Sequence, residues 1–418
     1  MPASHPPQVS ARIAFAYPNF TFLQLSRFLI ILAMEMQSVA VGWQVYEITK
    51  QPLALGLAGL AQFLPGILLF LVSGHAADRY DRRNLLVMCD VGFTTCFALL
   101  LFITMRGSHT VRPIYGALIL LGVFRSFSGP VSRAIFPQLV PKEHFQNAVA
   151  WSSGIYQAAN ILGPALGGVI YAIFRGPAAV YTFALVAGAC ASIAALQIKT
   201  PSKSWTPEPY SATAVFSGFR YIWKQKPILG SISLDLFAVF LGGAVALLPV
   251  YAREILKTGP WGLGLLRTAP GVGAAVMAVF LAHKPLRKRA GAIMLWCVAG
   301  FGIFTIVFGI SRNIVLSFVA LLLVGAMDMV SVIIRATLIQ IATPDEMRGR
   351  VNAVDMVFIG ASNEFGEFES GLTAHWFGTV PAVVLGGIGT LAVTAIWAWR
   401  FPELRKTDNL ARKDEDEP

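Results

Sequence analysis

The chain has 418 residues, of which 56% are hydrophobic and 13% are charged, and its mean hydropathy is +0.64. Soluble domains carry about 25% charged residues because a surface that faces water must be polar, so the composition excludes a soluble protein and predicts an integral membrane protein. The formal net charge of +11 falls in short loops between apolar runs. We therefore expect contact with a lipid bilayer and no nucleic-acid partner.

Long apolar runs, separated by Gly, Pro and charged residues, continue along the whole chain. A helix that crosses the hydrocarbon needs about 20 mostly apolar residues, and a β-barrel is disfavoured because its strands alternate over about ten. The runs predict an all-α membrane protein with twelve transmembrane helices, near 20–48, 53–76, 84–106, 113–137, 145–173, 178–198, 228–252, 262–283, 290–311, 314–341, 350–375 and 380–400.

Lysine and arginine are unevenly shared between the connections of these helices. Most of them fall in the connections on the side of the N-terminus, and fewer in the connections on the other side. Because Lys and Arg favour cytoplasmic loops, we expect a multi-pass protein of the inner (plasma) membrane with both termini in the cytoplasm.

The connection after the second apolar run contains GHAADRYDRR, from Gly74 to Arg83. This segment resembles the loop signature between the second and third helices of the major facilitator superfamily. It departs from the signature at Asp81, where a second glycine is usual. Basic side chains are stabilised by the unpaired carbonyls at the C-terminus of one helix, and an acidic side chain is stabilised by the free N–H groups at the N-terminus of another. We expect a conformational latch between two halves of the molecule, formed by Gly74, Asp78, Arg79, Arg82 and Arg83 with Arg348 and Arg350. The alternative is that the charges only set topology.

The fourth and fifth predicted helices carry further similarity to this superfamily. LGVFRSFSGP is similar to its helix-four motif, which is centred on an arginine, here Arg125. ANILGPALGG resembles the helix-five motif of its exporters, in which small residues permit close helix approach and a bend. The residues matched to that motif are Ala159, Gly163, Pro164, Gly167 and Gly168. GWQVYEIT, PLALGLAGLAQFLP and SNEFGEFESG look closest to the enterobactin-exporter and transmembrane secretion effector branch.

Two segments of the chain recur about 205 residues later. RAIFPQLVPKEHFQNAVA from Arg133 matches RATLIQIATPDEMRGRVNAV from Arg335, and EITKQPLALGL from Glu47 matches EILKTGPWGLGL from Glu254. Such a repeat predicts the two parallel halves of a rocking transporter. We expect an N-terminal six-helix half over 1–198, a cytoplasmic linker with a possible interfacial helix over 199–226, a C-terminal six-helix half over 227–401 and a charged cytoplasmic tail over 402–418.

Ionisable residues in the middle of the predicted helices are functional candidates, because each costs about 2.5–3.5 kcal/mol to insert. Glu35, Arg125 and Asp328 lie mid-helix. The resemblance implies that helices one, four, seven and ten line a central cavity, so we expect Arg125 to face Asp328, while Asp235 corresponds to Arg27. Static buried pairs are the alternative. The predicted substrate cavity comprises Gln37, Trp43, Gln44, Gln157, Asn160 and Asp235, although ordinary packing would also account for these residues.

The eleventh predicted helix contains NEFGEFESG, with Glu364, Glu367 and Glu369 within six residues. Glu364 and Glu367 are one turn apart on one face of a helix. Two carboxylates so close cannot both ionise cheaply away from water, so one is expected to hold a proton. We assign proton coupling to Glu364 and Glu367, with Arg125, Asp328 and Glu35 as further candidates. Glu369 faces elsewhere and ranks lower.

The sequence offers no pattern for a metal, a cofactor or an enzyme. Its four cysteines lie in apolar runs without Cys-x-x-Cys spacing, and its histidines form no metal-binding pair. A phosphate-binding loop is absent, so energy must come from an ion gradient or a partner.

We expect a monomeric, proton-coupled exporter of a small amphipathic molecule, either siderophore-like or drug-like, that works by alternating access. A proton symporter, a lysophospholipid flippase and a non-transporting membrane receptor or scaffold are the alternatives.

Overall fold

The computed structural model describes residues 12–107, 110–199, 212–284, 286 and 289–405. Within those ranges the chain is almost entirely helical, and it contains no β-strand. The N-terminal half comprises η1 (Ile13–Ala16), α1 (Pro18–Thr49), α2 (Pro52–Leu68), α3 (Phe70–Arg79), α4 (Arg82–Met105), α5 (Arg112–Ile135), η2 (Phe136–Gln138), η3 (Lys142–His144), α6 (Phe145–Phe174) and α7 (Pro177–Leu196).

The C-terminal half follows the expected linker, of which residues 200–211 lie outside the described part of the chain. The end of that linker forms the short helix α8. The expected tail begins with the short helix α16, and residues 406–418 again lie outside the description. The elements of this half are α8 (Ala212–Lys224), α9 (Lys226–Gly242), η4 (Ala244–Leu247), α10 (Leu248–Val250), the π-helical η5 (Tyr251–Ile255), α11 (Gly259–His283), α12 (Ala290–Ile310), α13 (Ile314–Ala342), α14 (Asp345–Phe377), α15 (Thr379–Arg400) and α16 (Pro402–Arg405).

Ten helical segments of the described chain are long and apolar enough to cross a membrane. The segment α2–α3 and the helix α14 are not among them. The first is divided at Leu69, between α2 and α3, one turn after Pro65. The second has the length to span but carries several acids. Together with these two, the helices are consistent with the expected twelve.

The seventh expected helix, 228–252, is also interrupted. Helix α9 ends at Gly242, and η4, α10 and η5 continue the path. The hydroxyl of Ser370 in α14 donates a hydrogen bond of 2.9 Å to the carbonyl of Gly243. A carbonyl released by the break therefore keeps a partner, as a buried backbone group requires.

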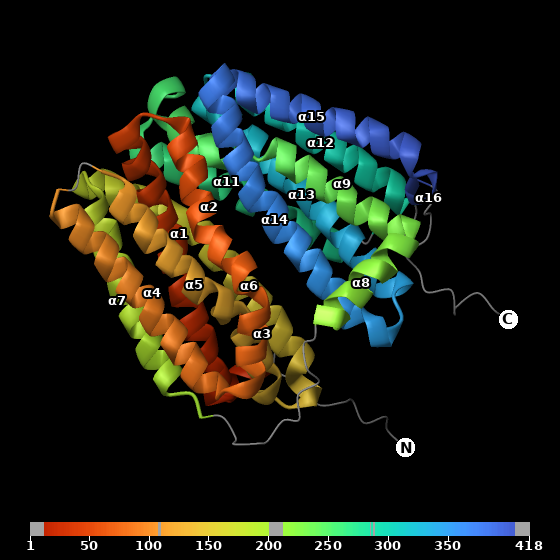
Figure 1. Ribbon diagram of the computed structural model, residues 1–418, viewed down its shortest axis with the longest axis horizontal. Helices are drawn as coiled ribbons and strands as arrows, with labels where there is room; N and C mark the ends of the chain where they lie inside the picture. Colours follow the sequence, from red (N-terminus) through yellow and green to blue (C-terminus); the bar gives the residue numbers. More distant parts are fainter. Residues whose placement is uncertain (1–11, 108–109, 200–211, 285, 287–288, 406–418) are drawn as a thin grey trace, which may run out of the picture.

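Two groups of helices lie side by side, and α2 and α14 run next to each other where the groups meet (Figure 1). Helix α6 of the first group packs against α11 of the second. There the backbones approach so closely that a Cβ atom built on Gly168 would lie 2.7 Å from the Cα atom of Gly264. The small residues of the helix-five motif thus lie where helices meet without side chains between them, as in other membrane bundles.

Among the described residues, the two groups share a buried apolar cluster at one end of the molecule only. We call the end at which α1 begins and α5 ends the terminal face, and the end at which α1 ends and α2 begins the opposite face. One buried apolar cluster near the opposite face combines residues of both groups, such as Tyr46, Leu55, Tyr251 and Leu263. Toward the terminal face each group has its own cluster. The molecule is therefore closed at the opposite face and divided at the terminal face.

Candidate functional site

Five charged side chains from both halves gather where the halves meet, and we call them the central cluster: Glu35 of α1, Arg125 of α5, Arg267 of α11, and Glu364 and Glu367 of α14. Arg125 Nη1 lies 3.2 Å from Glu364 Oε1. Glu35 lies within electrostatic range of both arginines and of Glu364, and Glu367 is within range of the other four residues. Arg267 also donates a hydrogen bond to Ser38 of α1.

The central cluster lies between two cavities. A cavity of about 630 Å³ is walled by α1, α4, α5 and α6, extends toward the terminal face, and includes Glu35 and Arg125 in its lining. A second cavity, of about 50 Å³, lies on the side of the opposite face and includes Arg267 and Glu367. Charged groups therefore stand between the open and the closed ends of the molecule.

A glycine on α2 makes room for the acids of α14. A Cβ atom on Gly59 would lie 2.7 Å from Glu367 Oε2. One turn along α2, a Cβ atom on Gly56 would lie 3.0 Å from the Cα atom of Phe368. Because these two positions lack side chains, α2 and α14 approach closely enough to place Glu367 between them.

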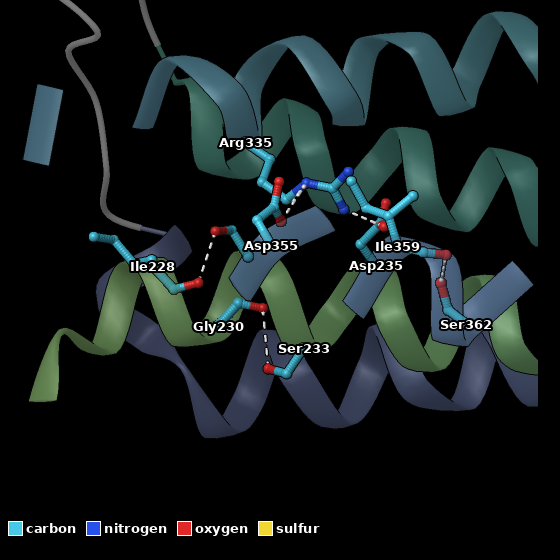
Figure 2. Close-up of polar contacts among 9 residues, drawn as sticks. Ile228, Gly230, Ser233, Asp235, Arg335, Asp355, Ile359 and Ser362 are labelled. Atoms are coloured by element: carbon cyan, nitrogen blue, oxygen red, sulfur yellow. Dashed lines mark hydrogen bonds and ion pairs between the residues drawn. The ribbon is translucent and has the colours of Figure 1, made fainter. Parts of the chain in front are cut away.

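A second charged group lies inside the C-terminal half, and we call it the aspartate–arginine group: Asp235 of α9, Asp328 and Arg335 of α13, and Asp355 of α14. Figure 2 shows Arg335 between two of these acids. Its guanidinium forms an ion pair with Asp235, and its Nε lies 3.5 Å from Asp355 Oδ1. Asp328 lies within electrostatic range of Asp235 and Arg335. None of these four residues lines the two cavities described above.

A model of the family described as transmembrane secretion effector matches residues 10–418 of the chain. The chain belongs to this family of the major facilitator superfamily. Among similar proteins, the enterobactin exporter EntS of Shigella boydii serotype 4 is 27% identical over 389 residues, 90% of this chain and 86% of the relative. EntS of Citrobacter koseri is 28% identical over 391 residues, with the same coverage of both chains.

Solved structures of other transporters share the fold of this secretion effector. A D-xylose–proton symporter has a TM-score of 0.69 at 14% identity, over 93% of this chain and 99% of the other. A bacterial homologue of the iron transporter ferroportin, in an inward-facing state, has a TM-score of 0.71 at 16% identity, over 93% and 98%. These findings confirm the predicted family and all-α fold class. The secretion effector is a multi-pass membrane transporter of a family that does not consist of enzymes.

The expected pairing of Arg125 with Asp328 is wrong. In the secretion effector Arg125 pairs with Glu364, whereas Asp328 lies with Asp235 and Arg335 in the C-terminal half. The reason is the place of α14, which packs against α2 of the first half and α9 of the second and so brings its acids to Arg125. Arg27, the counterpart of Asp235, likewise bonds within its own half, to Ser152.

Of the six residues assigned to the substrate cavity, Asn160 lies in the wall of the large cavity and Gln37 in that of the small one. The other four have structural partners. Gln44 is buried and bonded to Tyr181 and Thr104. Trp43 is buried against Tyr171 and Arg253, Gln157 donates to the Gly271 carbonyl, and Asp235 belongs to the aspartate–arginine group.

The helix-five residues have the packing role that was expected of the motif. Ala159, Gly163, Pro164, Gly167 and Gly168 are all buried. Gly163 and Gly167 lie against α1, and the carbonyl of Pro164 lies against Gly264 of α11.

The latch residues stand at the terminal face. Gly74 and Arg79 lie in α3 together with Asp78, whose side chain is outside the described part of the structure. Arg82 donates a hydrogen bond to the carbonyl of Ala134 and Arg83 to that of Leu196, at the ends of α5 and α7, where helix carbonyls attract cations.

The latch residues of the C-terminal half lie at the start of α14. Arg350 donates a hydrogen bond to Ser217 of α8, while Arg348 lies one turn into α14. Because the halves are divided here, the latch stays a prediction.

Asp81 stands where the superfamily signature usually has a second glycine, and it is the N-cap of α4. Its carboxylate accepts a hydrogen bond of 3.0 Å from the backbone N–H of Asn84.

Sequence reasoning missed Arg267. It lies within the apolar run 262–283, so the rule that selected Arg125, an ionisable residue inside a predicted membrane helix, would have selected it as well.

Proposed function

We propose that this secretion effector is a proton-coupled exporter that moves a small amphipathic molecule, siderophore-like or drug-like, out of the cell by alternating access. The observation that carries the proposal is the position of the central cluster between a large cavity and a small one, on helices of both halves. A proton acceptor at this place meets water from one end in one state and from the other end in the next.

Charge balance supports a proton site in the central cluster. Three carboxylates and two guanidinium groups share a volume that only partly faces water, with Glu364 14% and Arg125 50% exposed, and a charge without a partner is costly where water is excluded. One bound proton on Glu35, Glu364 or Glu367 makes the cluster neutral. Glu364 is the carboxylate that connects the halves through Arg125, so a proton on Glu364 would weaken this contact and favour separation of α14 from α5.

The relatives and the charge pattern support an outward direction of transport and a location in the inner membrane. Two similar proteins are enterobactin exporters of bacteria. We therefore place the chain in the inner membrane with both termini in the cytoplasm, organised as two six-helix halves over 1–198 and 227–401. The terminal face, where the large cavity lies, then faces the cytoplasm, from which an exporter loads its substrate.

Transport into proteoliposomes tests the proposal. Purified protein is reconstituted with an acidic lumen, and a panel containing a catecholate siderophore, drug-like dyes and a lysophospholipid is offered outside. Proton-driven export predicts accumulation of a siderophore or dye that stops when an ionophore collapses the gradient.

Accumulation only with an acidic exterior would indicate a symporter, and movement of the lysophospholipid alone would indicate a flippase. Absence of any flux, with protein in its folded state, would favour a receptor or scaffold and contradict the proposal.

A further inference from the structure

Two arginines lie together in the wall of the large cavity, and neither is paired with the acids of that wall: Glu35 belongs to the central cluster, and Asp90 accepts a hydrogen bond from Ser26. Arg27 of α1 and Arg133 of α5 both line this cavity near the terminal face. Arg27 Nη1 donates a bond of 2.6 Å to the hydroxyl of Ser152, and its charged or ionisable neighbours are Tyr156 and Arg133. Arg133 is exposed and contacts the sulfur of Met356 across the gap between the halves. Among the described side chains, neither arginine forms an ion pair with a carboxylate.

In the C-terminal half, the arginine that corresponds to Arg133 is neutralised by an acid. Arg335 is the repeat counterpart of Arg133, and Asp235 of α9 lies within one residue of the position that the repeat gives for Arg27 of α1. Asp235 and Arg335 form a buried ion pair with each other (Figure 2). The N-terminal half thus has Arg27 near the position at which the C-terminal half has the neutralising acid Asp235. Its two charges, Arg27 and Arg133, are therefore both positive.

An anion would stabilise two guanidinium groups that lie near each other in this way. Arginine keeps its charge at every pH that a cell reaches, so neither residue escapes repulsion by losing a proton. The guanidinium fork also matches the planar carboxylate and other oxyanions. The nearby cavity wall is aromatic as well as basic, with Phe93, Phe136, Phe145 and Tyr156.

We propose that Arg27 and Arg133 form an anion-binding subsite, which selects substrates that carry a carboxylate or similar acidic group on an aromatic or apolar body. The assignment of the ligand as a transported substrate rests on the proposed function, whereas the binding itself does not require transport. Arg125 is a separate cation, because Glu364 already neutralises it.

Calorimetric titration of the purified protein in neutral detergent tests the subsite without any proton gradient. The probes are 1-naphthoate, its neutral amide and sodium chloride. We expect 1-naphthoate to bind at least tenfold more tightly than the amide. Arg27→Gln and Arg133→Gln should each weaken its binding at least tenfold, and Arg27→Lys should restore part of it. Arg312→Gln, which changes an exposed arginine at the opposite face, is the matched control and should bind as the wild type does.

Arg27→Asp is the most discriminating variant, because it places an acid next to Arg133, as Asp235 lies next to Arg335 in the C-terminal half. It should abolish binding of 1-naphthoate while the unfolding temperature stays at or above that of the wild type. Undiminished binding in this variant, equal binding of the acid and the amide, or binding of chloride as tight as that of 1-naphthoate would each overturn the proposal. Failure of proton-driven transport with binding intact would instead count against the proposed function alone.

Discussion

Arg125 and Arg335 are both arginines inside membrane helices, yet their surroundings give them different roles. The side chain of Arg125 is 50% exposed in the large cavity and pairs with one acid, Glu364. The side chain of Arg335 is 3% exposed and contacts two acids, Asp235 and Asp355. Water can replace the partner of an exposed charge but not that of a buried one. We infer that the Arg125 contact opens and closes, whereas the Arg335 contacts are permanent.

Neutral glutamine at the acids of the central cluster should uncouple transport. In Glu364→Gln and in Glu367→Gln the proton site is lost, so exchange of substrate down its own gradient should persist while proton-driven accumulation falls to background. Transport in proteoliposomes at several pH values measures both. Glu369→Gln is the matched control, because Glu369 lies on the same helix but bonds to Thr373 outside the cluster. Uphill transport with unchanged pH dependence in both variants would place the proton site elsewhere.

The aspartate–arginine group makes a prediction about stability rather than coupling. Arg335→Gln leaves three acids without a cation and should cost about 3–5 kcal/mol, the usual effect of breaking a buried pair. Asp235→Asn leaves Arg335 with Asp355 and should cost clearly less. Thermal unfolding in detergent compares the two variants. Equal losses would show that Arg335 is not the charge that holds the group together.

The sequence identifies most of these charged residues but not their partners. An ionisable residue in an apolar run is visible without a structure, as Glu35, Arg125 and Asp328 were. The partner depends on the rotation of each helix about its axis and on which helix lies beside it. Arg125 was matched with Asp328 through the repeat, and only the packing of α14 against α2 shows that Glu364 is nearer.

At the scale of the elements, hydropathy predicts helices well and their interruptions poorly. The apolar runs predicted membrane helices along the chain, because length and apolar content decide that property. The ends of α2 at Leu68 and of α9 at Gly242 were not predicted. Apolar content does not change at those points. The hydrogen bond from Ser370 to Gly243 comes from a helix more than 100 residues away. A local sequence pattern does not reveal such a distant partner.

The contact between α6 and α11 should depend on glycine at its closest point. In Gly168→Val the new side chain would meet the backbone of Gly264, so the two helices must move apart at the opposite face. We expect transport to fall at least tenfold and a cysteine introduced at Ser38, on the small cavity, to become accessible to a water-soluble reagent. Gly154→Val on the same helix is the control, because open space surrounds Gly154. Normal transport in Gly168→Val would show that the contact is not required.

At the scale of the whole molecule, the repeat reappears in the contacts that close the opposite face. Glu47 and Glu254 are counterparts in the two halves, and both lie near Arg253, at 3.4 and 3.9 Å. The guanidinium of Arg253 also lies 5.4 Å from the ring centroid of Trp43, and Tyr171 donates to Glu47. One arginine of the second half is thus held by the first half. We propose that this group closes the opposite face and that the latch around Asp78 closes the terminal face.

These two sets of contacts should therefore act in opposite directions on one conformational equilibrium. Arg253→Gln removes a contact of the state closed at the opposite face and should favour closure of the terminal face. Asp78→Asn should favour the open terminal face. Partly exposed ion pairs contribute about 0.2–1 kcal/mol, so each variant should change the ratio of the two states up to about fivefold.

Spin labels on Lys142 and Glu346, exposed residues of the two halves at the terminal face, report the distance across it. Shorter distances in Arg253→Gln and longer ones in Asp78→Asn are expected, with transport reduced in both because each variant populates one state too strongly. A shift in the same direction in both variants, or no shift with full transport, would mean that these charges serve topology and packing rather than the exchange between states.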